Sequence, residues 1–252
     1  MRQQITRLVS IGLGILVLIG SAQASQLWQG SRSIPRIALT FDDGPKPEKS
    51  KPLLAILDQY GVRATFFVVG QSVTDYPDMV LRLADSGHEL ANHSFSHRRL
   101  TTLSKREIQN ELDQTNTLIE SITHQPVRFF RPPGGRYNAT VLSEAKKRGL
   151  IMAMWDVNAG DYTPHSDMIT IQTKDQALMA NTTLITSILN QAQNGSIILF
   201  HNGGAQTTAI LPAIILGLQS AGFELVTLSE LISDSPPKTS RFTPSQSWVT
   251  VP

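Results

Sequence analysis

Two clusters of residues in this sequence carry the side chains that metal-dependent hydrolysis requires. Adjacent carboxylates stand at Asp42 and Asp43, and two histidines follow in a later segment at His93 and His97. Histidines four residues apart lie on the same side of a helical turn. With one carboxylate from another segment, they make the two-nitrogen, one-oxygen ligand set of catalytic zinc sites, which leaves a coordination position open for water. The pattern indicates a metal-dependent hydrolase.

Each cluster also has an interpretation without a metal. Asp42 could bond backbone amides in a turn closed by Gly44-Pro45, with Asp43 in solvent. The two histidines could be loop residues that bond to backbone groups. However, the acids follow the first predicted strand and the histidines follow the third, so both would lie at one rim of a parallel sheet. This joint placement favours a shared site over coincidence.

The hydrophobic pattern predicts the elements that position these clusters. Strands are expected over residues 36–41, 64–69, 88–92, 127–130, 151–157, 196–200 and 223–227. Helices are expected over 48–60, 74–86, 104–123, 138–148, 174–192 and 211–221, and Ser104 with Glu107 has capping-box spacing. Strands separated by helices pair in parallel, which predicts a single α/β domain, a distorted (β/α) barrel of about seven parallel strands. An open doubly wound sheet is the alternative.

The N-terminus has the pattern of a secretory signal peptide. Arg2 and Arg7 precede an apolar run over residues 8–19, and Ala22-Gln23-Ala24 has the small-x-small form of a cleavage site. The run is shorter than the roughly 20 residues of a membrane-spanning helix. We predict a signal peptide over 1–24, with an uncleaved anchor or a buried core helix as alternatives. A linker over 25–34, one domain over 35–232 and a tail over 233–252, rich in Pro, Ser and Thr, are expected to follow.

Charge and cysteine content limit the classes of partner. The chain has 22 Lys and Arg against 20 Asp and Glu, and two of the arginines belong to the predicted signal peptide. The rest of the chain is therefore balanced, which gives no whole-protein electrostatic case for binding nucleic acid or an anionic membrane. The chain has no cysteine, so any metal site must use nitrogen and oxygen ligands.

Five short motifs follow one another along the chain. They are Thr40-Phe41-Asp42-Asp43-Gly44, His93-Ser94-Phe95-Ser96-His97, Arg131-Pro132-Pro133-Gly134-Gly135, residues 156–162 and Leu199-Phe200-His201. In order and spacing they resemble the motifs of the polysaccharide deacetylases with a NodB homology domain, carbohydrate esterase family 4. The resemblance spans residues 35–231. It implies a distorted (β/α) barrel and a divalent metal, usually zinc, with cobalt or other ions sometimes substituting.

The resemblance also implies a role for each site residue. The family's metal ligands correspond to Asp43, His93 and His97. Its general base corresponds to Asp42, and the arginine that holds this base corresponds to Arg131. An opposite charge beside Asp42 would keep that carboxylate ionised.

The remaining family roles concern the leaving group and the substrate. The catalytic histidine, a general acid, corresponds to His201, and the acid that tunes it corresponds to Asp161. The apolar residue that packs against the acetyl methyl group corresponds to Leu199. The backbone N–H near Gly134 is a candidate donor to the oxyanion of the reaction.

Three positions depart from the family's usual residues. Asn158 stands where many members have a first acid, Tyr162 stands where tryptophan is commonest, and Gly134 occupies a position that is often aromatic. No predicted ligand, base or acid is lost. We expect these departures to affect the shape of the groove, and therefore the choice of substrate.

The function that follows is an exported, metal-dependent hydrolase that removes N-acetyl groups from N-acetylglucosamine-type polysaccharides such as peptidoglycan, chitin-like polymers or exopolysaccharide. The partner is an acetylated glycan, with no nucleic acid and no membrane contact after cleavage of the signal. A monomer in the periplasm, cell envelope or medium is expected. Cleavage of O-acetyl esters, as in acetylxylan, is one alternative. The other is a non-catalytic glycan-binding protein of the same fold.

Overall fold

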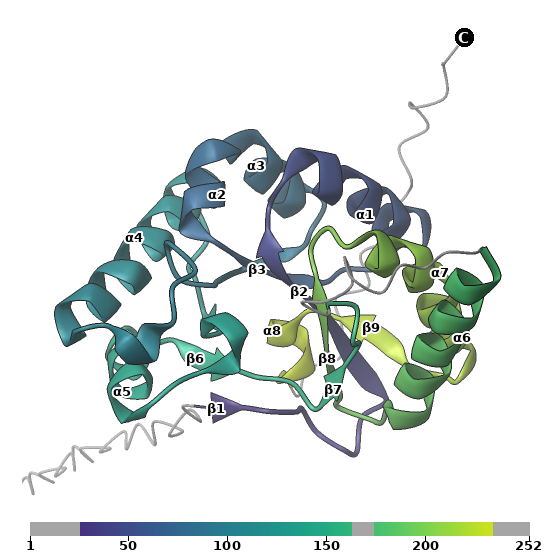
Figure 1. Cartoon of the computed structure of the whole chain (residues 1–252). Coiled ribbons are helices and arrows are strands. Elements are labelled where there is room, and N and C mark those ends of the chain that lie inside the picture. Colours follow the sequence, from purple (N-terminus) through teal and green to yellow (C-terminus); the bar gives the residue numbers. More distant parts are fainter. Residues whose placement is uncertain (1–25, 163–173, 234–252) are drawn as a thin grey trace, which may run out of the picture.

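The computed structural model describes residues 26–162 and 174–233, which form a curled parallel sheet with helices on its outer side (Figure 1). Its strands are β1 (Gln26–Leu27), β2 (Arg36–Gly44), β3 (Thr65–Val68), β4 (Glu89–Asn92), β5 (Phe129–Phe130), β6 (Ile151–Ala153), β7 (Val157–Asn158), β8 (Ile197–His201) and β9 (Glu224–Val226). The order is β1-β6-β5-β4-β3-β2-β8-β7, and β9 pairs with the start of β2. Because β1 and β7 are edges in the part of the chain that the structure describes, the barrel is open there. The predicted parallel (β/α) barrel is confirmed, with nine strands among the described residues.

The helices lie in the connections between strands on the outside of this sheet, except α8, which follows the last strand. They are α1 (Pro47–Gln59), α2 (Gly70–Asp75), α3 (Pro77–Asp85), α4 (Lys105–Thr123), α5 (Ala139–Lys147), α6 (Lys174–Gln191), α7 (Ala205–Ser220) and α8 (Leu228–Leu231). Two 3₁₀ turns, η1 (Leu100–Thr102) and η2 (Pro133–Gly135), lie in the connections. The predicted capping box opens α4, where the Ser104 side chain accepts from the Glu107 amide and Glu107 returns a bond to Ser104.

Side-chain alternation along the strands separates two cores. On β2, Leu39 and Phe41 belong to the larger cluster, which packs between the sheet and the helices. Ala38 belongs to the smaller cluster inside the curl, so Thr40 and Asp42, which have the same parity, also face inward. The strands are buried on both faces, as parallel strands covered by helices usually are. On β2, the inner-face polar side chain nearest the carboxyl end of the strand is therefore Asp42.

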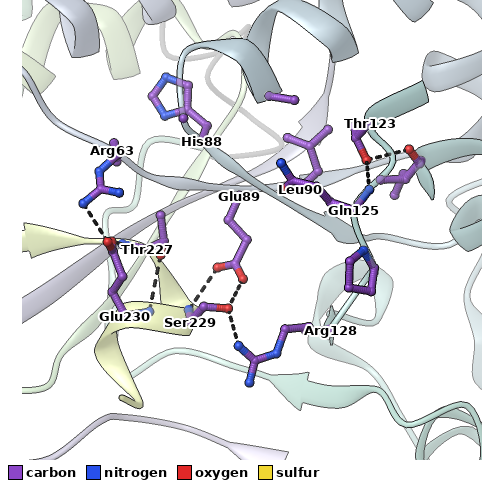
Figure 2. Close-up of a pocket in the computed structure, with 14 residues that line it drawn as sticks. Arg63, His88, Glu89, Leu90, Thr123, Gln125, Arg128, Thr227, Ser229 and Glu230 are labelled. Carbon is purple, nitrogen blue, oxygen red and sulfur yellow. Dashed lines mark hydrogen bonds and ion pairs between the residues drawn. The ribbon is translucent and has the colours of Figure 1, made fainter. Parts of the chain in front are cut away.

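The amino-terminal end of the barrel is closed by α8. Leu228 and Leu231 pack into the inner cluster. Their neighbours Thr227, Ser229 and Glu230 help to line a pocket of about 290 Å³, and Figure 2 shows these lining side chains. The carboxylate of Glu89 at the base of this pocket accepts from the Thr65 hydroxyl at 2.9 Å and from the Ser229 amide at 3.1 Å. Burial raises the pKa of Glu89. These bonds tie α8 to the beginnings of β3 and β4, so this polar cluster has a structural role at the end opposite the five motifs.

His88 lies beside this cluster and gives the fold an acid-sensitive group. It is 4% exposed, its Nδ1 accepts from the Ala64 amide at 3.1 Å, and its Nε2 has no partner among the described residues. Burial, with the nearby Arg63 charge, lowers the pKa of His88 to about 4. Because the folded pKa lies below the unfolded value, stability is lost as the pH falls from about 6.5 toward 4, by up to roughly 3 kcal/mol.

We expect a His88→Gln variant to lose much of this pH dependence, because glutamine keeps an acceptor for the Ala64 amide but does not titrate. Denaturant unfolding at pH 7.5 and pH 5 measures the difference for each protein. Equal slopes of stability against pH in the two proteins would show that His88 does not take up a proton on unfolding.

Several predicted elements differ from those observed, each for a local reason. The predicted strand 151–157 is divided into β6 and β7 because the Asp156 side chain accepts from the Ile197 amide at 2.7 Å and draws the chain across to β8. The predicted helix 74–86 is divided into α2 and α3 by Pro77, which has no amide hydrogen to donate and restricts the preceding residue. The helix predicted over 211–221 begins at Ala205 instead. The predicted linker 25–34 contains β1, which pairs with β6.

The predicted signal peptide lies outside the described residues, as does the predicted tail except for Ser233. Within 26–162 and 174–233, no helix has both the length and the apolar composition needed to cross a membrane.

Candidate active site

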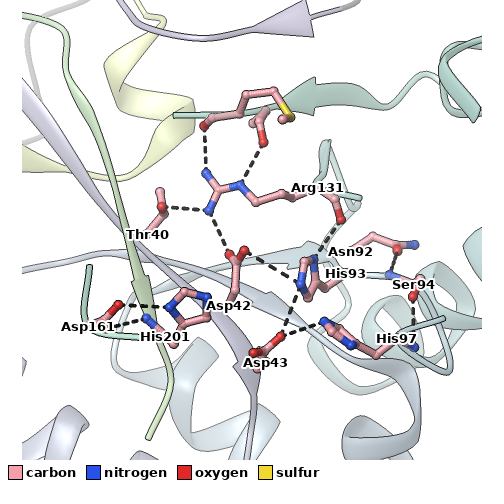
Figure 3. Close-up of polar contacts among 12 residues, drawn as sticks. Thr40, Asp42, Asp43, Asn92, His93, Ser94, His97, Arg131, Asp161 and His201 are labelled. Carbon is pink, nitrogen blue, oxygen red and sulfur yellow. Dashed lines mark hydrogen bonds and ion pairs between the residues drawn. The ribbon is translucent and has the colours of Figure 1, made fainter. Parts of the chain in front are cut away.

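Three of the motif residues converge at the carboxyl end of the barrel. The Oδ1 atom of Asp43 lies 3.3 Å from Nε2 of His93 and 3.0 Å from Nε2 of His97 (Figure 3). One ligand atom from each of the three side chains can be chosen so that all lie within 4.8 Å of one another. His93 is 1% exposed at its side chain, whereas Asp43 and His97 are partly open to solvent. The three predicted ligands therefore form one compact cluster with an accessible side.

An irregular turn brings the two histidine side chains together. The helical conformation expected between them is therefore wrong, although the two side chains do meet. Residues 93–99 are not helical, and Ser94 and His97 have left-handed φ values of 65° and 56°. The Ser94 hydroxyl accepts from the His97 amide at 3.1 Å, and the Asn92 side chain accepts from the Ser94 amide at 2.8 Å. Asp43 also has a left-handed φ, 74°. Such backbone conformations are uncommon for residues other than glycine and mark sites where the fold imposes geometry.

The hydrogen bond of His93 fixes which ring nitrogen can meet an ion. Its Nδ1 lies 2.8 Å from the carbonyl oxygen of Arg131, which only accepts hydrogen bonds. Nδ1 therefore carries the proton, and the lone pair of Nε2 points toward Asp43. Metal-binding histidines are commonly oriented in this way by a partner for their second nitrogen. The donor set fits a divalent metal ion, and Asp43, His93 and His97 are the residues that would hold it.

Electrostatics at this cluster also suit a cation. Burial by itself raises the pKa of Asp43, but hydrogen bonds and charge from His93 and His97 lower it by more, so the net pKa is below its usual range. Burial lowers the pKa of His93, and the carboxylates of Asp42 and Asp43 raise it overall. The site thus favours positive charge between these side chains, which protons or a metal ion can supply.

Asp42 is held by a buried arginine. Arg131 is fully buried and donates from Nη1 to Oδ1 of Asp42 at 2.8 Å and to the Thr40 hydroxyl at 2.9 Å. Its other nitrogens donate to the carbonyls of Ala153 and Met154. This leaves Oδ2 of Asp42 facing the ligand cluster, 3.7 Å from Nε2 of His93. Arg131 therefore fixes the direction of the free carboxylate oxygen, as Figure 3 shows.

Across the sheet, His201 forms a second acid–histidine pair. His201 and Asp42 are paired residues of β8 and β2, so both lie on the inner face. Nδ1 of His201 lies 3.0 Å from Oδ1 of Asp161, and the His201 amide donates to Oδ2 of the same carboxylate at 2.8 Å. Thr207 donates to that oxygen at 2.6 Å. Burial lowers the pKa of His201, but the bond and charge of Asp161 raise it by more, so the net pKa is above the usual value.

The three predicted substrate-contact residues lie around these groups. Gly134 is exposed in η2 with a left-handed φ of 61°, and a Cβ there would meet no other atom within 4 Å. The Tyr162 ring is 59% exposed, with its centroid 4.7 Å from that of His201. Leu199 is 4% exposed, two residues before His201 on the same face of β8. Asn158, one of the departures from the family pattern, pairs in register with Leu199.

The structure also identifies supporting residues that the motifs did not single out. Glu111 on α4 accepts from the turn between the two histidines, and Thr207 on α7 donates to Asp161. Asn202 donates its amide to the Asp42 carbonyl at 2.7 Å, and its side chain bonds to Ser50. Of these three residues, only Glu111 could have been noticed in the sequence, because a carboxylate between Ile108 and Leu112 interrupts the apolar face of a predicted helix.

Comparisons with known proteins agree with this arrangement. The family model described as polysaccharide deacetylase matches residues 29–153. A peptidoglycan-N-acetylglucosamine deacetylase of Bacillus cereus is 32% identical over 208 residues, which cover 81% of this chain and 92% of that protein. A chitooligosaccharide deacetylase of Rhizobium leguminosarum bv. trifolii is 34% identical, covering 77% of this chain and 90% of that protein. Other relatives are longer, and the chain spans 38% and 34% of two of them.

A solved structure extends the similarity to three dimensions. The crystal structure of a CE4 family pseudoenzyme from Bacillus anthracis superposes with a TM-score of 0.72 at 27% identity, covering 82% of this chain and 69% of that chain. The five motifs, the open parallel barrel and the relatives that match over most of their length all indicate the same family. The chain therefore belongs to the polysaccharide deacetylase family, carbohydrate esterase family 4.

Proposed function

We propose that the protein is an exported, metal-dependent hydrolase that removes N-acetyl groups from N-acetylglucosamine-type polysaccharides. The observation that carries the proposal is the convergence of Asp43, His93 and His97 beside the Arg131-held carboxylate of Asp42. The relatives named as peptidoglycan and chitooligosaccharide deacetylases support the substrate class.

Asp43, His93 and His97 are the proposed metal ligands. A divalent ion held by these residues supplies Lewis acidity and lowers the pKa of water toward neutrality. Zinc suits two imidazoles and a carboxylate with an open position, and cobalt or other divalent ions are expected to substitute.

Asp42 is the proposed general base. Its free Oδ2 faces the ligand cluster while Oδ1 is held by Arg131, so one oxygen is available to take a proton from the attacking water. The water oxygen forms a bond to the acetyl carbonyl carbon, whose π electrons move to the carbonyl oxygen. General base catalysis of this kind contributes about 10²–10⁴-fold to rate.

Three residues are proposed to contact the acetylated sugar. The backbone amide near Gly134 is the proposed donor to the carbonyl oxygen as its charge develops, an interaction worth about 3 kcal/mol in other hydrolases. Leu199 offers an apolar surface for the acetyl methyl group. The exposed ring of Tyr162 beside His201 offers a face on which a sugar can stack.

His201 is the proposed general acid. When the carbon–nitrogen bond breaks, the amine leaves with a proton that the imidazolium of His201 donates, and acetate is the second product. Asp161 holds the ring through Nδ1, which leaves Nε2 as the donating atom. The same carboxylate favours the protonated ring near neutral pH.

An Asp161→Asn variant tests this coupling through pH. Asparagine has no charge, so the pKa of His201 falls and the alkaline limb of the kcat/KM profile moves to lower pH. Each unit of fall lowers the protonated fraction above the pKa roughly tenfold. Deacetylation is measured from pH 5 to pH 10. Asp156→Asn is the matched control, because Asp156 bonds to Ser196 and Ile197 away from His201. An unmoved alkaline limb in Asp161→Asn would refute this role.

Two alternatives use the same fold. The site could cleave O-acetyl esters, and one relative is named a bifunctional xylanase/deacetylase. A non-catalytic glycan-binding role is the other alternative, and one structural neighbour, from Bacillus anthracis, is described as a CE4 family pseudoenzyme. Here, however, Asp42, Asp43, His93, His97 and His201 are all present and converge, which favours catalysis. Acetate release from N-acetylglucosamine oligomers, peptidoglycan and acetylated xylan, compared at equal acetyl concentration, ranks the three possibilities.

The proposed export is inferred from the signal-peptide pattern of residues 1–24. Residues 35–232 are proposed to form the catalytic domain. Named relatives are peptidoglycan deacetylases of bacteria, which is consistent with action outside the cell. N-terminal sequencing of protein recovered from a bacterial host tests the signal. A mature N-terminus directly after Ala24 is expected, and an intact N-terminus on membrane-bound protein would favour the anchor.

A further inference from the structure

Glu111 is a buried carboxylate on the mainly apolar inner face of α4. It is 8% exposed, and it shares the inner side of α4 with Ile108, Leu112 and Thr115. A charged side chain is costly at such a position unless it is hydrogen-bonded. Its partners lie in the turn that joins His93 to His97.

Both carboxylate oxygens of Glu111 are used by this turn. Oε2 accepts from the amides of Phe95 and Ser96, each at 2.8 Å, and Oε1 accepts from the Ser96 hydroxyl at 2.5 Å. On its other side, the turn is held by α2, where the amides of Gly70 and Gln71 donate to the carbonyls of Ser94 and Phe95. The turn is therefore clamped between two helices, with its amides directed to α4 and its carbonyls directed to α2.

The turn has a conformation that needs this support. Ser94 and His97 have left-handed φ values, which residues with a side chain adopt rarely. Among residues 26–162 and 174–233, the His97 ring has no hydrogen bond or ion pair apart from that with Asp43; it also lies against the His93 ring, and its side chain is 45% exposed. By contrast, His93 is buried and bonded to the Arg131 carbonyl. The position of His97 thus depends on the backbone of the turn, whereas His93 has its own anchor.

We infer that Glu111 is a positioning residue for the metal site. It fixes the Phe95 and Ser96 amides and so sets the backbone at His97, which places Nε2 of His97 3.0 Å from Oδ1 of Asp43. This inference rests on the proposed metal-binding role of Asp43, His93 and His97. Glu111 acts through His97 and touches neither substrate nor ion.

The test compares metal affinity in three variants. Glu111→Ala leaves three donors of the turn without their acceptor, and we expect the zinc dissociation constant to rise 10- to 100-fold, the usual range for supporting residues of metal sites. Glu111→Gln retains an acceptor for both amides and is expected to bind within threefold of the unmodified protein. Glu144→Ala is the matched control. Glu144 is also buried, but it pairs with Gln109, Lys147 and Arg148 away from the site.

Three readouts separate positioning from general stability. Competition with a chromogenic chelator gives the zinc affinity, and thermal unfolding of the metal-free proteins gives the stability. The visible spectrum of the cobalt form reports ligand geometry and is expected to change in Glu111→Ala alone. If Glu111→Ala proves unfolded, Glu111→Asp, whose carboxylate is withdrawn by one methylene, takes its place with an expected affinity loss of about tenfold.

The inference is overturned if Glu111→Ala, or Glu111→Asp in its place, binds zinc as tightly as the unmodified protein. It is also overturned if Glu144→Ala weakens binding equally, since the loss would then follow stability. Failure of the proposed metal-binding role gives a different result, because the unmodified protein itself would bind neither zinc nor cobalt, and failure of the proposed deacetylation shows as metal binding without acetate release.

Discussion

Replacing Asp43 with alanine is expected to abolish stoichiometric zinc binding and to lower kcat/KM for deacetylation by on the order of 10³-fold or more. The Asp43 carboxylate lies between Nε2 of His93 and Nε2 of His97, so it is the shared centre of the ligand cluster. Its loss leaves two imidazoles with no anionic ligand. Metal content by mass spectrometry and acetate release measure the two effects.

The neighbouring acid provides the control for this prediction. Asp42→Asn removes the proposed base but leaves all three proposed ligands, so it is expected to retain metal while losing activity. If Asp43→Ala retains zinc at unit stoichiometry and still releases acetate, the assignment of the metal site is wrong.

Replacing His201 with glutamine is expected to separate amide from ester hydrolysis. An amine leaves only with a proton, so loss of the general acid should lower N-deacetylation by about 10²–10⁴-fold. An activated acetyl ester such as 4-nitrophenyl acetate expels a stable anion that needs no proton, and its hydrolysis should fall far less. The ratio of the two kcat/KM values is the measured quantity.

The control for His201→Gln is its metal content, which should equal that of the unmodified protein because His201 is outside the ligand cluster. Equal losses on the two substrates would argue that His201 serves in attack or in folding, and not in expulsion of the amine.

The sequence predicted the parts of the fold that depend on hydrophobic pattern. Parallel strands joined by helices, the capping box at Ser104 and the convergence of the five motifs at one rim were all foreseeable, because strand ends in such folds meet at one edge. The pairing of β2 with β8, which brings Asp42 opposite His201, was not predicted, because the hydrophobic pattern does not specify which strands are neighbours.

Other features depend on contacts between distant segments. The division of the strand predicted over 151–157 depends on Asp156 bonding to Ile197, about forty residues away. In the turn between His93 and His97, two residues have left-handed φ values, in part because Glu111 and α2 hold the turn. The four-residue spacing of the histidines alone suggested a helical turn. Thr207 reaches Asp161 only because α7 begins at Ala205. Local periodicity contains none of this information.

Acetate release from N-acetylglucosamine oligomers by the protein lacking residues 1–24 tests the central claim most directly. The protein is stripped of metal, reloaded with zinc or cobalt, and compared with Asp42→Asn treated in the same way. Release that requires the metal and falls about 10²–10⁴-fold in the variant is the predicted result. Stoichiometric metal binding without acetate from these oligomers, peptidoglycan or acetylated xylan would contradict it and favour a glycan-binding protein.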